Sequence, residues 1–185
     1  MIEVLVAILL VSVGLLGIAG LSGATFRYNK VAQIRLTGLA LANDLADRAR
    51  VNVYGFDRSG YNITLTQTPA TTPVTVPSAN LSLDPSVAAN AITVADALAA
   101  YDVDQFLRHV ANRLPQGRAV VTGRPGLNSR DLDVWLLWKE PQTDAADTAF
   151  SGENSVFGAG QGNCPNSLTV AERAEYSCLY YKVGL

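Results

Sequence analysis

The chain has 185 residues, of which 49% are hydrophobic and 16% charged, and its formal net charge is −2. Charged residues make up about a quarter of an ordinary soluble domain, so apolar residues must be concentrated in one part of this chain. The weakly acidic balance disfavours a general nucleic-acid binder, the two cysteines and one histidine are too few for a Cys/His zinc site, and the apolar content excludes disorder throughout.

The excess of apolar residues lies at the N-terminus, where residues 4–26 contain no charge and no proline. As a helix rising about 1.5 Å per residue, this stretch can cross a bilayer core of about 30 Å. It could be a signal peptide cleaved near Ser22, although the acidic start and the long apolar run disfavour that. It could also be a simple anchor, or a helix in which Glu3 has a function, because a carboxylate in hydrocarbon is costly unless a cation pairs with it.

A helical pattern continues beyond the apolar run. Asp44 and Arg48 stand four residues apart, a spacing at which opposite charges pair on a helix. We predict one helix to about Val51, whose second half packs on a head domain; the alternative is a separate amphipathic helix after a hinge at residues 20–23. The apolar stripe consists of Val31, Ile34, Gly38, Leu41, Leu45 and Ala49.

The middle of the chain predicts an exposed connection followed by a second helix. Residues 64–77 are rich in threonine and contain prolines, which suits an extended loop or a sheet edge. Apolar residues at helical spacing then predict a helix over 94–114, ended by Pro115 and Gly117.

Two strands joined by a turn are predicted next, over residues 118–122 and 131–139. In the second strand, Leu132 and every second residue to Trp138 share one face, and we expect Trp135 on the other face to pack against the head. A glycine- and asparagine-rich surface loop is expected over 151–166, and a final strand over 179–183.

The sequence contains no recognisable catalytic, cofactor or metal motif, so we predict no enzyme activity, no cofactor and no metal. The glycine-rich residues 158–162 follow no parallel strand and lack a G-K-[ST]. His109 is expected to be an ordinary helix residue, because nothing resembles a nucleophile elbow. Two aspartate pairs lack the further oxygen ligands of a calcium loop and are expected to be solvated: Asp102 with Asp104, and Asp131 with Asp133.

Cys164 and Cys178 form neither a C-x-x-C motif nor a cluster with histidine, which disfavours redox and metal roles. Beyond the cytoplasmic membrane, such a pair in a loop-rich segment is typical of a disulfide. Basic residues after the apolar run, such as Arg27 and Lys30, would by themselves place the C-terminus in the cytoplasm. Because the cysteine pair favours the other side, we predict that the head lies outside.

The residues Ile2-Glu3-Val4-Leu5-Val6-Ala7, followed by an uninterrupted apolar helix, resemble the start of type IV pilins and type II secretion pseudopilins. The resemblance implies a precursor whose short leader is removed by a prepilin peptidase, followed by N-methylation. That leader is not part of this sequence, so we expect a longer precursor. The resemblance further implies that Glu3 acts in assembly, by pairing with the N-terminal ammonium of an adjacent subunit.

Two later segments resemble minor pilins of the PilV type: residues 102–117 and the V-W-L-L-W-K-E run from Val134. The cysteine pair resembles the C-terminal disulfide region of many pilins. The resemblance implies a pilin-like α+β fold, in which a long N-terminal helix packs on a head with an antiparallel sheet and one further helix. The expected parts are 1–26, a transmembrane and assembly helix; 27–55, its amphipathic continuation; and 56–185, a periplasmic head with a disulfide loop.

The function implied by this resemblance is that of a minor pilin, which helps to initiate the type IV pilus and forms part of its tip, supporting adhesion and twitching motility. The implied partners are other minor pilins, the major pilin and a large tip adhesin, with no nucleic acid. The protein would be held in the inner membrane by a single span before it enters the extracellular pilus. The alternatives are a type II secretion minor pseudopilin, a DNA-uptake pilin, and a membrane-anchored periplasmic binding module or enzyme.

Overall fold

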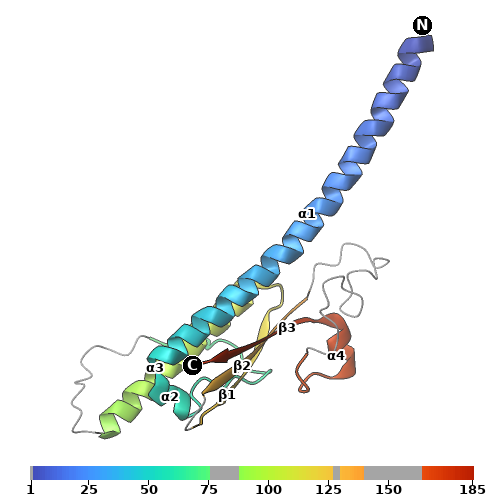
Figure 1. Ribbon diagram of the computed structural model, residues 1–185. Helices are drawn as coiled ribbons and strands as arrows, with labels where there is room; N and C mark the ends of the chain where they lie inside the picture. The colour runs from blue at the N-terminus through green and yellow to red at the C-terminus, as the bar shows by residue number, and fades with distance from the viewer. Residues whose placement is uncertain (1, 76–87, 127–129, 140–163) are drawn as a thin grey trace. The chain divides into compact units, whose positions relative to one another are not determined.

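A computed structural model describes residues 2–75, 88–126, 130–139 and 164–185 (Figure 1). The chain divides into two compact units, Met1–Leu36 and Thr37–Leu185, and the boundary falls within the first helix. The elements in chain order are α1 (Ile2–Val51), α2 (Val53–Asp57), α3 (Ala88–Arg113), β1 (Arg118–Arg124), β2 (Asp131–Trp138), α4 (Val170–Glu175) and β3 (Ser177–Gly184).

The first unit consists of α1 as far as Leu36. The apolar side chains of residues 2–23 are exposed; Leu5, Leu9 and Leu16, for example, are 68%, 60% and 73% exposed. α1 is long and apolar enough to cross a membrane. The helix runs without interruption through residues 20–23, so the alternative of a separate helix after a hinge is wrong, and the predicted single helix to Val51 is confirmed.

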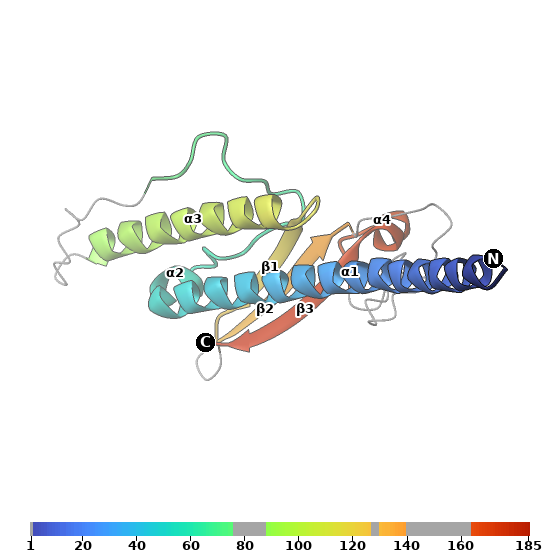
Figure 2. The same cartoon turned by 90° about the horizontal axis from the view of Figure 1, so that it is seen from above.

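The second unit contains a three-stranded antiparallel sheet in the order β1-β2-β3. β1 and β2 form the predicted hairpin, whose pairing begins at Arg124 and Asp131. The final strand is also confirmed, although β3 is longer than predicted. Figure 2 shows α3 running alongside residues 37–51 of α1, with the strands beneath them.

One face of the sheet, here called the inner face, carries Leu132, Val134, Leu136 and Trp138 of β2, all buried as the alternation predicted. Residues 37–51 of α1 cover it: a side-chain carbon at Gly38 would lie 3.5 Å from Leu179 and 3.6 Å from Leu136. The opposite face of the sheet is the outer face.

Three elements differ from the predictions. α2 is a separate short helix that was not predicted; it begins after Asn52, whose side chain caps it by accepting the Gly55 N–H. α3 begins at Ala88 instead of residue 94. α4 was not predicted, although its N-terminus has a sequence signal: Thr169 and Glu172 form a capping box, in which each side chain bonds the other's backbone N–H. Of the predicted exposed connection, residues 64–75 contain no helix or strand, and 76–77 lie outside the described residues. Most of the predicted surface loop, including residues 158–162, also lies outside them.

Candidate functional site

Glu3 lies in the first turn of α1, on the same helical face as Ala7 and close to Val4 and Ile8. A carboxylate at this end of a helix interacts favourably with the helix dipole. Among the described residues, no side chain forms an ion pair or hydrogen bond with Glu3. Glu3 is therefore an acidic residue near the start of an exposed apolar helical segment.

Asp102 joins the end of α1 to α3 and the residues after α2. Its carboxylate accepts hydrogen bonds from Arg48 Nη1 at 3.0 Å and from the Tyr61 hydroxyl at 2.7 Å. Asp102 and Tyr61 are 4% and 0% exposed. Arg48 Nε also lies 3.0 Å from Asp44, as the four-residue spacing predicted. Asp102, Arg48, Tyr61 and Asp44 are here called the Asp102 network. The network fixes the head on the second half of α1.

The Asp102 network shifts the ionisation of its members. Burial alone would lower the pKa of Arg48, but its hydrogen bonds with Asp102 and Asp44 outweigh burial and raise it. Burial raises the pKa of Tyr61, and the bond to Asp102 raises it further, because a phenolate beside a carboxylate is unfavourable. Both shifts keep Arg48 and Tyr61 in their protonated forms at neutral pH, in which each can donate to the Asp102 carboxylate.

Asp104 holds the chain before α3 in place. Its carboxylate accepts N–H groups from Ala70 at 2.8 Å and Val74 at 3.2 Å, and it pairs with Arg108 Nε at 2.8 Å. Burial would raise the pKa of Asp104, but the bonds from Arg108 and from the backbone of Ala70 and Val74 outweigh it, so that the net pKa is lowered.

The prediction that both aspartate pairs form solvated acidic faces is wrong for three of the four carboxylates. Asp102 and Asp104 are buried, as described above. Asp133 is 0% exposed; it accepts a hydrogen bond from the Tyr180 hydroxyl at 2.7 Å and pairs with Arg124 at 2.8 Å. Asp131 is only half-buried and lies 3.2 Å from the Lys182 amine. Burial is possible because each carboxylate has a basic partner.

We expect Asp104→Asn to flatten the acid dependence of head stability. A lowered pKa in the folded state stabilises the fold above the unfolded pKa of about 3.9, and this contribution is lost as pH falls through the folded pKa. The variant should be about 1–3 kcal/mol less stable at pH 7 and should lose less stability between pH 5 and pH 2. Urea unfolding followed by the fluorescence of Trp135 and Trp138, the two tryptophans of the chain, measures this. Asp47→Asn, at a side chain 71% exposed, is the matched control and should change little.

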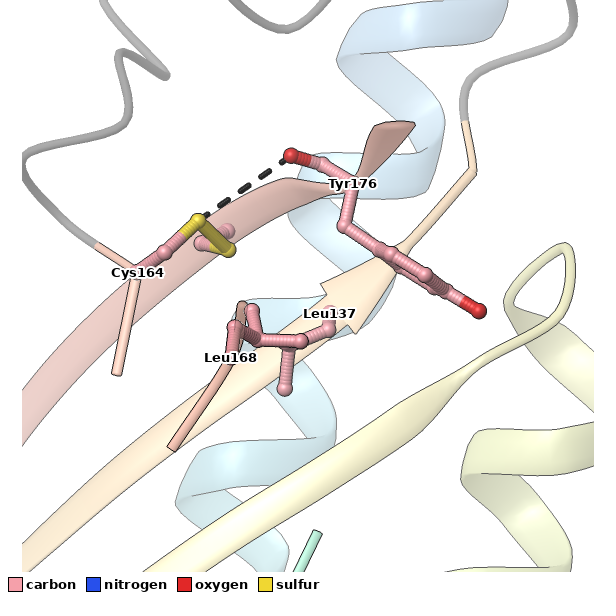
Figure 3. Packing of buried hydrophobic residues seen from close by; sticks show 5 residues of the cluster. Leu137, Cys164, Leu168 and Tyr176 are labelled. Carbon is pink, nitrogen blue, oxygen red and sulfur yellow. Dashed lines mark hydrogen bonds between the residues drawn. A yellow bond between two sulfur atoms is a disulfide. The ribbon is translucent and has the colours of Figure 1, made fainter. Parts of the chain in front are cut away.

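Cys164 and Cys178 form the predicted disulfide, with their Cα atoms 5.2 Å apart. The bond ties the chain before α4 to the start of β3. The two sulfurs lie in a small buried cluster with Leu137, Leu168 and Tyr176 (Figure 3). The disulfide is therefore part of this hydrophobic cluster. It also holds the chain that leads into α4 against the outer face of the sheet.

Replacing both cysteines with serine should destabilise the head by about 3 kcal/mol, the loop-closure value for a loop of about 15 residues. Fluorescence-monitored urea unfolding compares the variant with the oxidised protein. Ser167→Ala, an exposed position in the same loop, is the control and should unfold like the unchanged protein. Equal stability of the double serine variant and the oxidised protein would contradict a stabilising role for the bond.

The described residues contain no group of three or more His, Cys, Asp or Glu side chains that could hold a metal ion. A cavity of about 540 Å³ lies between residues 65–69, α3 and Tyr176. Its described wall is mostly apolar, and Arg118 is the only charged residue in it. His109 lies half-buried in α3 and is not part of this wall.

Comparisons with protein-family models, with curated proteins and with solved structures each found no match. The resemblance to pilins, which was drawn from the residues, therefore remains a prediction. The α+β fold, the apolar N-terminal helix and the Cys164–Cys178 disulfide are properties of the structure.

Proposed function

We propose that the protein is a minor pilin of the type IV pilus, which helps to initiate the filament and is incorporated near its tip. The observation that carries this proposal is the construction of α1. A single helix of 50 residues begins with a carboxylate in an apolar segment and continues as a helix that the head buries on one side. An anchor without assembly would need neither Glu3 nor a continuous helix.

The exposed apolar side chains of α1 support storage in a membrane followed by transfer into a filament. Exposed side chains of this kind require an apolar environment, which lipid supplies before assembly. A bundle of neighbouring helices is equally apolar, so moving the helix from lipid into the filament costs little free energy. Packing between helices and a specific polar pair can then decide where the subunit stops.

Glu3 supplies that polar pair in the proposed assembly. Its carboxylate would accept the N-terminal ammonium of a neighbouring subunit, either the major pilin or another minor pilin. A charge pair in hydrocarbon is favourable only when both partners are present and aligned. Glu3 would therefore fix the position of each helix along the filament axis. Forming the pair also removes two unpaired charges from the lipid, which makes assembly more favourable.

The head supports a structural role in this proposal. The Asp102 network and the disulfide brace it. A braced head on a continuous helix is suited to a structural role at the pilus tip. There, other minor pilins and a large adhesin would be its partners. In the proposal, the head lies in the periplasm before assembly and outside the cell afterwards.

Deletion of the gene in its native host tests the proposal. Surface pili and twitching motility should be lost, while secretion of folded proteins continues, and expression of the full precursor from a plasmid should restore the pili. Loss of secretion with normal pili would instead identify a type II secretion pseudopilin. Normal pili, motility and secretion would contradict both functions.

A further inference from the structure

β1 and β3 are the two edges of the sheet, and the described residues cover them differently. At β1, the chain's own residues bond the edge. The Ile63 N–H donates to the Val121 carbonyl at 2.9 Å, and the Val121 N–H donates to the Ile63 carbonyl at 3.0 Å. The Asn62 side chain accepts the Gly123 N–H at 2.7 Å. The edge of β1 is therefore closed at Val121 and Gly123.

These bonds fix which backbone groups of β3 point outward. Val121 bonds Ile63, so its N–H and C=O point away from β2, and its register partner Val134 must bond β3 instead. Val134 is paired with Tyr181, whose groups therefore point toward β2. Because backbone groups alternate along a strand, those of Tyr180 and Lys182 point away from the sheet.

Gly184 supports this assignment. It lies two residues after Lys182 in β3, so its backbone groups point in the same outward direction as those of Tyr180 and Lys182. Its carbonyl accepts a hydrogen bond from Arg50 Nη2 at 3.0 Å, which closes this end of the edge. Within the described ranges, no residue hydrogen-bonds the backbone N–H or C=O groups of Tyr180 and Lys182. An open strand edge is a ready template for another chain, and proteins usually block it with proline, charge or a bulge. Here Lys182 is the only charged residue of β3.

We propose that the outward edge of β3 accepts an extended strand from a neighbouring subunit, so that the sheet continues from one head into the next. This inference rests on the proposed function and names the contact that the head makes. Backbone N–H and C=O groups in β spacing are satisfied together only by another extended backbone, which is why the partner is a strand and not a helix or a small molecule.

The side chains beside this edge define the partner further. Tyr180 is 42% exposed on the outer face, its ring lies 5.0 Å from that of Trp135, and its hydroxyl is held by Asp133. It is therefore a fixed aromatic surface for an apolar side chain of the incoming strand. The Lys182 side chain is 49% exposed and lies two residues from Tyr180 on the same face. It therefore favours an acidic side chain on the incoming strand, two residues along that strand from the apolar side chain that contacts Tyr180.

Lys182→Pro tests the inference, with Lys182→Thr as the matched control. Both variants remove the lysine side chain and its pairing with Asp131, but only proline removes the outward N–H. Proline is tolerated on an edge strand whose N–H faces away from the ladder. Both variants should fold, which tryptophan fluorescence and the intact mass of the disulfide form would verify. We expect the amount recovered with sheared pili to fall about tenfold for proline relative to threonine. Equal recovery of the two variants would overturn the inference.

Hydrogen exchange of the unchanged full-length protein gives a second readout. In detergent, the Tyr180 and Lys182 amides should exchange fast and the Tyr181 amide slowly. In sheared pili, the first two should slow about tenfold. Slow exchange already in detergent would show that the edge is occupied without a partner, by residues 140–163 or by a second copy, and would overturn the inference.

The same exchange measurement on native membranes separates the inference from the proposed function. Recovery of the protein in pili with unchanged fast exchange would overturn the strand contact and leave the pilin function standing. If the protein is absent from pili, the pilin function fails. In that case, slowed exchange of Tyr180 and Lys182 in membranes would still support an edge partner, and unchanged exchange would overturn it.

Discussion

Replacing Glu3 with leucine should leave the protein in the membrane at normal levels and reduce its recovery in sheared pili at least about tenfold. A carboxylate costs about 2.5–3.5 kcal/mol at the bilayer centre and less near the interface, so leucine should insert at least as well. In the proposed filament, however, the change would leave a neighbour's ammonium buried without a partner. Breaking a buried charge pair in this way costs about 3–5 kcal/mol, which is more than enough for a tenfold loss.

Val4→Leu is the matched control for this experiment, because it changes a neighbouring residue of the same exposed helical segment without altering charge. The full-length precursor must be used for both variants, and membrane and pilus fractions quantified by immunoblot. Val4→Leu should be incorporated normally. Equal incorporation of Glu3→Leu and Val4→Leu would contradict the assembly role of Glu3.

Asp102→Asn should destabilise the head by about 3 kcal/mol. The asparagine keeps the shape of the side chain but removes the charge that pairs with Arg48, and it leaves the half-buried guanidinium with Asp44 alone. The value lies at the low end of the range for a broken buried pair, because the Arg48 side chain is 31% exposed and water screens part of the loss. Urea unfolding at pH 7 with tryptophan fluorescence measures the change.

Tyr61→Phe is the comparison for Asp102→Asn. It removes one hydrogen bond from the same carboxylate while keeping the Arg48 pair, so we expect a smaller loss of about 1 kcal/mol. The order of the two effects is the informative result. A larger loss for Tyr61→Phe, or no loss for Asp102→Asn, would contradict the charge pair as the main contribution of the network.

The elements with regular periodicity were predictable from the sequence. The apolar run, and the stripe that includes Leu41 and Leu45, gave α1 to Val51, and the alternation around Val134 gave β2 with the correct inner face. The cysteine pair was also predictable, because an isolated pair in a loop-rich segment has few other roles. These features depend on residues that are near one another in the sequence, so the spacing of residue types is enough to predict them.

The buried carboxylates could not be predicted, because their partners lie far away in the sequence. Asp102 is paired with Arg48, which is 54 residues away, and Asp104 bonds backbone N–H groups at Ala70 and Val74. An aspartate at such a position resembles any solvated helix residue until the fold supplies its donors. The start of α4 is different, since the three-residue spacing of Thr169 and Glu172 is a local capping signal that the sequence itself contains.

The most direct test of the pilin function is the distribution of the unchanged protein between the inner membrane and purified sheared pili. Quantitative mass spectrometry of peptides from the head, such as those spanning β2, would measure the protein in both fractions alongside the major pilin. We predict that the protein is present in the pili in small amounts relative to the major pilin, and also in the membrane. Abundant pili that lack the protein, with all of it retained in the membrane, would contradict the function proposed here.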